Sequence, residues 1–147
     1  MLELESDYFY MERALAQGKL AGERGEVPVG AVIVSDDNII AKAHNLTEQL
    51  TDVTAHAEMQ AITAASHYLG SKYLKNCRLF VSLEPCAMCA GALYWAQIGE
   101  INFAASDPKR GYRALQATLH PKTKVNHGIL EDQALYLLQS FFQSKRN

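Results

Sequence analysis

Two pairs of residues in this chain have the types and spacings that metal or redox chemistry needs. Cys86 and Cys89 lie three positions apart and follow Pro85, a residue type favoured in the first helical turn. Both sulfurs then face the same way, and the unpaired backbone amides of a helix start favour a thiolate over a thiol. This geometry suits a zinc ion, and it also suits a dithiol of the thioredoxin kind. The CxxC spacing alone leaves the two open.

A histidine in the stretch TAHAEMQAI favours zinc. His56 would add an imidazole to the two cysteines, and three protein ligands with an open fourth position are typical of catalytic zinc. A structural site would need a fourth ligand. Cys77 could supply one, but it lies at a predicted strand nine residues before Cys86, and we interpret it as an ordinary small buried residue. We therefore predict one zinc ion per chain, held by His56, Cys86 and Cys89.

Glu58 has a chemical role in such a site. Zinc lowers the pKa of a bound water to about 7, and a neighbouring carboxylate can take that proton and hand it to a departing group. His56 and Glu58 splay around the first helical turn, so one can bind metal while the other reaches the substrate. Taken alone, Glu58 would be a solvent-facing helix residue and His56 a helix cap or a core histidine. Zinc chemistry is favoured because all four residues fit one site.

An alternation of helices and strands must position these residues. Ser6 is a candidate N-cap of a first helix that ends near Gly22 and Gly25; Thr54 is expected to start the helix with the histidine and the glutamate, and Gly70 to end it. The other predicted elements are strands 29–34 and 39–45 joined by the turn SDDN, strand 77–83, helix 86–96, strand 100–105, and a last amphipathic helix with Ala134, Leu138, Phe141 and Phe142 near one stripe. This order predicts an α/β fold, a three-layer α/β/α sandwich with a mixed central sheet.

The composition is that of one globular domain. The 147 residues are 48% hydrophobic and 20% charged, and no repeat or linker divides them, so we expect a single domain over residues 1–147. Met1–Tyr10 carries three acids and no base, and the longest apolar stretch, Cys86–Ala96, is shorter than the roughly 18 residues that a membrane span needs. Three cysteines argue against a disulfide framework. We expect a cytoplasmic protein that does not enter a membrane.

The net charge of −2 hides an uneven distribution. Residues 1–58 hold 11 acidic and 4 basic residues, whereas residues 59–147 hold 5 acidic and 10 basic ones. The second half could present a basic surface to a polyanion. Charge alone favours the simpler interpretation, in which these are solvated faces.

His56-Ala57-Glu58 followed by Pro85-Cys86-Ala87-Met88-Cys89 is the signature of zinc-dependent nucleobase deaminases. With VPVGAVIV, AHN, LEPCAMCAGA and the terminal FFQSKR, it makes the chain resemble the bacterial tRNA-specific adenosine deaminases, within the cytidine/deoxycytidylate deaminase superfamily, from about Ser6 to Arg146. The resemblance implies a cytidine deaminase-like fold and hydrolytic conversion of adenosine to inosine. It also implies a tRNA anticodon stem-loop as partner, with its wobble position as the target.

The resemblance also implies roles for single residues. The family's metal ligands correspond to His56, Cys86 and Cys89, and its proton shuttle to Glu58. The residues that would contact the substrate are Asn45, Val29, Ala57 and Asp107. An asparagine that ends a strand is more often a turn former, and a valine a core residue.

Basic residues of the second half would meet the RNA phosphates. They are Lys109, Arg110, Arg113, Lys122, Lys124, Lys145 and Arg146. Between Gly111 and Gly128 the stretch YRALQATLHPKTKVNH departs from the commoner pattern of the family. The resemblance therefore does not fix the RNA contacts of this loop.

Two alternatives stay open. The stretches GALYWAQ and FAA are similar to guanine deaminases, so a guanine or cytosine deaminase acting on free bases or nucleosides is the first. Those enzymes usually have an aromatic residue in place of Val29, a proline in place of Ala87 and no basic FFQSKR ending. A CxxC redox or structural zinc-binding module is the second, and it leaves Glu58 unexplained.

The resemblance implies a homodimer. Leu93, Tyr94, Trp95 and Ile98 are candidate interface residues, although an apolar helix stripe is more often core.

Overall fold

The computed structural model describes residues 3–146 and arranges them around one five-stranded sheet. The strands are β1 (Gly30–Ser35), β2 (Asn38–His44), β3 (Cys77–Leu83), β4 (Glu100–Ala105) and β5 (Lys124–His127). They lie in the order β2-β1-β3-β4-β5, with antiparallel pairing of β1 to β2 and β3, and parallel pairing of β4 to β3 and β5. The predicted mixed sheet is confirmed.

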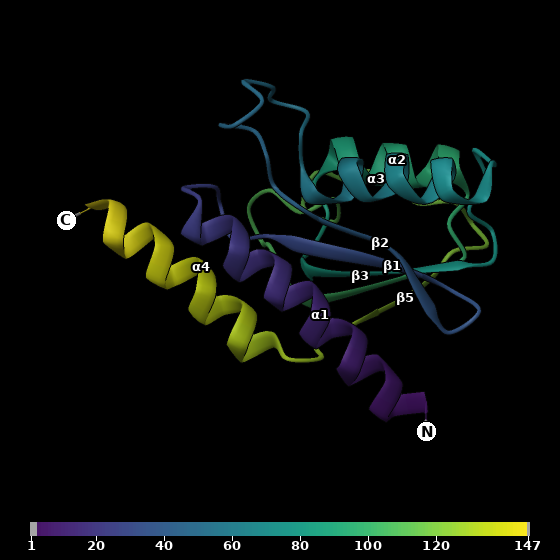
Figure 1. Cartoon of the computed structure of the whole chain (residues 1–147), viewed down its shortest axis with the longest axis horizontal. Coiled ribbons are helices and arrows are strands. Elements are labelled where there is room, and N and C mark those ends of the chain that lie inside the picture. Colours follow the sequence, from purple (N-terminus) through teal and green to yellow (C-terminus); the bar gives the residue numbers. More distant parts are fainter. Residues whose placement is uncertain (1–2, 147) are drawn as a thin grey trace.

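Helices cover both faces of the sheet (Figure 1). α2 (Ala57–Leu69) and α3 (Ala87–Ala96) lie side by side on one face, and α1 (Glu3–Glu23) and α4 (Glu131–Arg146) lie on the other. Apolar side chains fill both interfaces, because successive strand residues alternate between the two faces. The three-layer α/β/α sandwich is confirmed. Within residues 3–146, no helix is long and apolar enough to cross a lipid bilayer.

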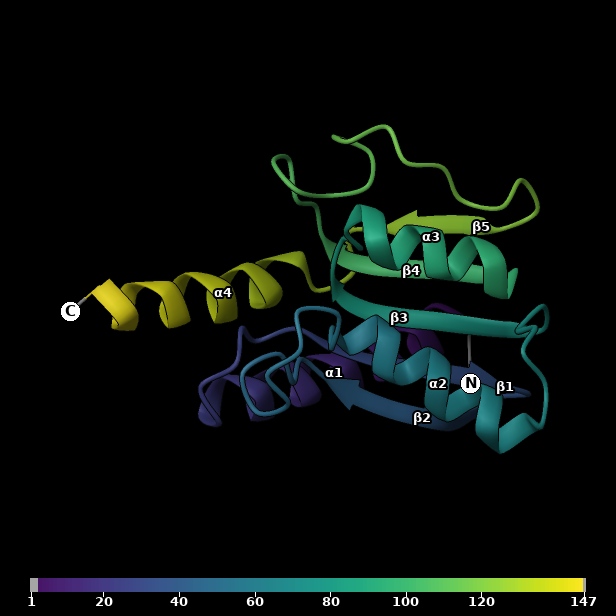
Figure 2. The same cartoon turned by 90° about the horizontal axis from the view of Figure 1, so that it is seen from above.

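The topology brings several chain segments to one edge of the sheet. β3 and β4 are parallel, so the residues that follow them, Glu84–Cys86 and Ser106–Asp107, meet at the carboxyl edge. The amino ends of α2 and α3 lie above the same edge (Figure 2). The predicted metal ligands therefore come together from two helix starts.

Two predicted boundaries differ from the structure. α1 has already begun at Glu3, so Ser6 lies inside this helix and is not its N-cap. α2 starts at Ala57 rather than Thr54, because Asp52 Oδ1 accepts hydrogen bonds from the Thr54 amide and hydroxyl, and this local turn competes with a helix. The predicted turn in SDDN is confirmed by positive φ angles at Asp36 and Asp37, which suit a two-residue hairpin.

The carboxyl-terminal third holds an element that the pattern did not predict. β5 (Lys124–His127) forms the end of the basic stretch Asp107–His127, where its four residues pair with the start of β4. α4 agrees with the prediction in part: Ala134 is buried and Leu138 packs on the core, whereas Phe142 is 46% exposed. The last turns of α4 extend beyond the sheet (Figure 2), so the predicted stripe is covered only along its first half.

α1 packs closely on β1 at Gly30. A Cβ atom built on Gly30 would overlap the backbone oxygen of Ala14 and the backbone nitrogen of Gly18. Only a residue without a side chain permits this approach. Since Val29 precedes Gly30 directly, the same packing fixes the start of β1 beside the predicted site.

We expect Gly30→Ala to lower the free energy of unfolding by about 3 kcal/mol, because helix backbone atoms cannot move away as a side chain could. Gly22→Ala is the matched control within α1, since its Cβ would lie 3.4 Å from Pro28 Cβ, an ordinary contact. Urea unfolding of both variants measures the difference. Equal stability would contradict the close packing.

Candidate active site

The predicted metal ligands stand at two helix amino ends. His56 is the N-cap residue of α2 and Cys86 that of α3, and neither side chain makes a capping hydrogen bond. Cys89 lies in the first turn of α3 and is fully buried. Pro85 precedes the N-cap, and the predicted helix 86–96 begins one residue later than expected, with Cys86 next to its opening turn. Both helix dipoles direct their positive ends at the sulfurs and favour thiolates.

The ligand atoms have the spacing of a tetrahedral zinc site. His56 Nδ1 lies 3.5 Å from Cys86 Sγ and 3.6 Å from Cys89 Sγ, and all three atoms lie within 4.8 Å of one another. Zinc bonds of roughly 2.3 Å to sulfur and 2.05 Å to nitrogen, at a tetrahedral angle, would separate nitrogen and sulfur by about 3.6 Å. The donor set therefore fits one zinc ion. Cys77 is buried at the start of β3 and is not part of this group.

The two cysteines are coupled. The hydrogen bond from Cys89 lowers the pKa of the Cys86 thiol to about 4, although burial opposes this shift. The same pair interaction and burial raise the pKa of Cys89. A bound dication would favour the ionised form of both sulfurs.

Glu58 is buried beside these ligands. It is 4% exposed, so the interpretation as a solvent-facing helix residue is wrong. Burial raises the pKa of its carboxyl group to about 7, and the negative charge of Cys86 adds to that shift. A carboxyl group with this pKa can both accept and release a proton near neutral pH.

Asn45 links two other predicted substrate residues, Val29 and Ala57. The Asn45 side-chain oxygen Oδ1 accepts a hydrogen bond of 2.8 Å from the Ala57 backbone amide. The Asn45 backbone amide donates to the Val29 carbonyl. Its Nδ2 donates to the Val27 carbonyl at 3.2 Å. Asn45 therefore caps α2 in place of His56, a role that the sequence did not indicate. Val29 and Ala57 are buried on either side of it.

Glu84, which the sequence analysis missed, holds the loop after β4. Its buried carboxylate accepts hydrogen bonds from the backbone amides of Asp107 and Arg113 and from the Arg113 guanidinium. A Cβ on Gly111 would overlap Glu84, and Gly111 forms a β-bridge with Cys86. This loop is thereby fixed against the metal ligands. The signal was an acidic residue directly before Pro85, at the end of an apolar strand.

The predicted substrate residue Asp107 and the predicted RNA contact Arg113 have partners within the chain. Asp107 Oδ1 accepts hydrogen bonds from the amides of Lys109 and Arg110, which closes a turn. The Arg113 guanidinium contacts Glu84 and Ser106 and lies over the Phe103 ring. Arg113 is thus engaged in holding the loop.

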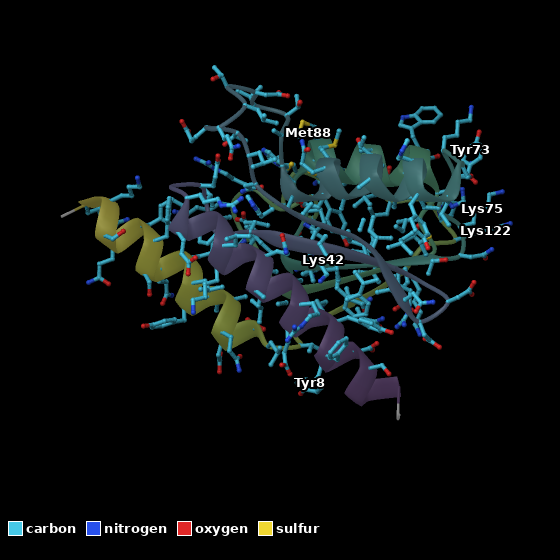
Figure 3. All side chains as sticks on the ribbon, in the orientation of Figure 1. Tyr8, Lys42, Tyr73, Lys75, Met88 and Lys122 are labelled. Atoms are coloured by element: carbon cyan, nitrogen blue, oxygen red, sulfur yellow. The ribbon has the colours of Figure 1, made fainter. Side chains whose placement is uncertain are left out.

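The other basic residues divide between two ends of the molecule. Lys109 and Arg110 are exposed on the loop beside the site, and the α4 end with Lys145 and Arg146 projects on the same side. Lys122 lies at the opposite end, near Lys75 and Tyr73 (Figure 3), whereas Met88 marks the end with the cysteines. Lys124 pairs with Glu100 at the start of β4, also away from the site.

Comparisons with known proteins support this geometry. Residues 4–105 match the family model described as the cytidine and deoxycytidylate deaminase zinc-binding region. The chain is 46% identical to a tRNA-specific adenosine deaminase of Aquifex aeolicus (strain VF5) over 145 residues, which cover 95% of each chain.

Solved structures of deaminases have a similar fold. A structure from a study of A-to-I editing by tRNA:A34 deaminases at the wobble position of transfer RNA has a TM-score of 0.82 and 40% identity, covering 88% of this chain and 99% of that one. A guanine deaminase from Bacillus subtilis has a TM-score of 0.68 and 36% identity, covering 82% of this chain and 72% of that one.

We expect one zinc ion per chain, and Cys89→Ser should remove it because oxygen replaces one of only three protein ligands. Cys77→Ser is the control and should retain the metal. Metal analysis of both purified variants measures the ratio of zinc to protein. Loss of zinc from Cys77→Ser, with retention in Cys89→Ser, would show that the ligand set is wrong.

Proposed function

This chain belongs to the family of zinc-dependent cytidine and deoxycytidylate deaminases, and we propose that it converts adenosine to inosine at the wobble position of a tRNA anticodon loop. The observation that carries the chemistry is a buried carboxyl group, Glu58, beside three ligand atoms arranged for zinc. The choice of a tRNA substrate is supported by the relatives that are tRNA-specific adenosine deaminases.

The reaction replaces the amine at C6 of adenine with oxygen from water and releases ammonia. A zinc ion held by His56, Cys86 and Cys89 would supply the Lewis acid that activates the attacking water. Glu58 accepts one proton from that water and delivers it to the ring nitrogen beside C6. It then accepts the remaining proton from the new C6 hydroxyl and delivers it to the amine, so that the C6 carbonyl forms as ammonia leaves. Its pKa of about 7 suits both directions of transfer.

Substrate contacts follow from the residues around Asn45. We assign Asn45 to the target nucleotide, because its Nδ2 has a second hydrogen beyond the one given to Val27. Val29 and Ala57 border the base, and Asp107 shapes the loop opposite them. An anticodon base is already unpaired, so inserting it costs little stacking energy.

Phosphate contacts are assigned first to Lys109, Arg110, Lys145 and Arg146, which lie at the same end of the molecule as the site. Lys122 and Lys124 would meet only RNA that extends along the molecule to its other end. Arg113 contributes through the loop that it holds with Glu84.

We also propose a homodimeric, cytoplasmic enzyme whose residues 1–147 form one domain. Leu93 and Ile98 are 0% and 1% exposed, so these two candidate interface residues belong to the core of the chain. Trp95 is 77% exposed on α3, beside a groove of about 250 Å³ that Gly91, Tyr94 and Ala117 help to line. The α3 surface is therefore the proposed dimer interface.

A guanine deaminase remains the second candidate, because a guanine deaminase from Bacillus subtilis is 36% identical to this chain. Val29 and Ala87, with the basic end of α4, favour the tRNA substrate. A dithiol redox module is disfavoured, since it gives no role to a buried Glu58.

Glu58→Ala removes the proton shuttle without removing a metal ligand. We expect turnover to fall by at least about 100-fold while zinc and RNA binding persist. Single-turnover kinetics and metal analysis measure both quantities. Loss of zinc from this variant would make Glu58 a ligand, contrary to the proposed role.

The substrate is tested by inosine formation in a tRNA anticodon stem-loop against xanthine formation from guanine. RNA binding should weaken steeply with salt through counterion release, whereas deamination of a free base should not. Replacing Lys109 and Arg110 with alanine should weaken RNA binding and flatten its salt dependence. Lys75 and Tyr73 lie at the other end of the molecule (Figure 3), and Lys72 lies over the same Tyr73 ring as Lys75. Because both lysines are exposed, they supply the matched double variant.

That control should bind RNA as the unchanged protein does. Rapid, salt-insensitive conversion of guanine without inosine in any tRNA would overturn the proposed substrate and leave the zinc chemistry in place.

A further inference from the structure

A second buried carboxylate, Glu26, has no part in the zinc chemistry. It lies between α1 and β1 and is 1% exposed. Its Oε1 accepts hydrogen bonds from the Glu48 amide at 3.0 Å and the Thr47 hydroxyl at 3.3 Å, and its Oε2 accepts one from the Gln49 amide at 2.8 Å. Three donors of the loop between β2 and α2 thus converge on one side chain from another part of the chain.

The charge state of Glu26 suits this arrangement. Burial raises the pKa of its carboxyl group, but the hydrogen bonds from Glu48, Gln49 and Thr47 outweigh burial, so the pKa lies below its ordinary value. A carboxylate has acceptor sites on both oxygens and no donor, which matches three converging donors.

The segment that contains Glu26 holds the same loop at a second place. Val27 accepts the hydrogen bond from Asn45 Nδ2, and Arg24 Nη1 lies 3.4 Å from His44 Nε2. Because an arginine can only donate, His44 must accept at Nε2 and donate from Nδ1 to the Asn45 carbonyl at 2.8 Å. Asn45 is therefore held through its backbone and its side chain.

Beyond Gln49 the loop has little apolar anchoring. Leu50 is 50% exposed and Val53 is 85% exposed. Figure 1 shows this loop standing beyond the amino end of α2, on the side of the predicted site. Glu26 is thus the buried anchor at the base of an otherwise exposed loop.

We infer that Glu26 is a positioning residue for the RNA substrate: it fixes Thr47–Gln49 and so keeps Asn45 in the orientation that caps α2 and meets the target nucleotide. This inference rests on the proposed function. The hydrogen-bond partners of the Glu26 carboxylate are Thr47, Glu48 and Gln49, none of which is a metal ligand, so its loss should affect substrate binding more than the chemical step.

The test uses zinc-loaded Glu26→Gln, in which one carboxylate oxygen becomes an amide that faces a hydrogen-bond donor. We expect the KM for a tRNA anticodon stem-loop to rise by about tenfold, the factor that corresponds to loss of one hydrogen bond to a charged group. The kcat should change by less than about twofold, because Glu58 and the ligands keep their places. Zinc content should not change.

Glu48→Gln is the matched control, because it removes an exposed carboxylate from the same loop. Amide hydrogen exchange supplies a readout that does not depend on activity: exchange at Thr47–Gln49 should accelerate in Glu26→Gln and not in Glu48→Gln. A merely structural role would instead lower the protection of α2 and β1 as a whole, and kcat with it.

Unchanged exchange and KM in Glu26→Gln, or an equal effect of Glu48→Gln, would overturn the inference. If the unchanged protein forms no inosine in tRNA, the proposed function fails. The exchange comparison would still show whether Glu26 holds the loop.

Discussion

The meeting of two helix amino ends at the carboxyl edge of β3 and β4 is the interaction on which the rest of the structure depends. His56 and Cys86 occupy the N-cap positions of α2 and α3 without capping them, so both side chains are available to a metal. The His56 nitrogen lies 3.5 and 3.6 Å from the two sulfurs, and the positive ends of two helix dipoles at this place favour anionic sulfurs, which are the form that binds zinc. Parallel pairing of β3 with β4 sets this geometry, because both strands deliver their following loops to the same edge.

Two buried carboxylates, Glu26 and Glu84, fix two loops near this edge of the sheet. Glu26 collects donors from the loop before α2, and Glu84 collects donors from the loop after β4. Both carboxylates accept hydrogen bonds from backbone amides. Each therefore fixes a loop segment by means of a single buried charge. Glu58 is also buried, but there burial outweighs its hydrogen bonds, so the pKa of its carboxyl group is raised to about 7. Environment alone therefore separates two structural carboxylates from one that can exchange protons.

The sequence predicted the metal ligands better than it predicted the residues that hold the surrounding loops. The HxE and CxxC spacings are local and each stands at a predicted helix start, so the sequence alone predicts the ligand group, and the structure brings His56, Cys86 and Cys89 together. The roles of Glu26 and Glu84 depend on partners more than 20 positions away, and no periodic pattern indicates such partners. Arg113 was assigned to RNA from its charge, whereas the structure directs its guanidinium to Glu84. β5 was missed because four residues that pair with a distant strand leave almost no local signal.

The two outer strands of the sheet limit how copies of this chain can associate. An unpaired strand edge is a template for another strand, and proteins discourage such pairing with short strands, charged side chains and irregular register. β5 has four residues and an exposed Lys124, while β2 carries an exposed Lys42 and a register shift opposite β1. Continuous sheets that run from one molecule into the next, the route to fibrous aggregates, are therefore disfavoured at both margins. Association is left to helical surfaces, among which α3 with its exposed Trp95 offers the largest aromatic side chain of the chain.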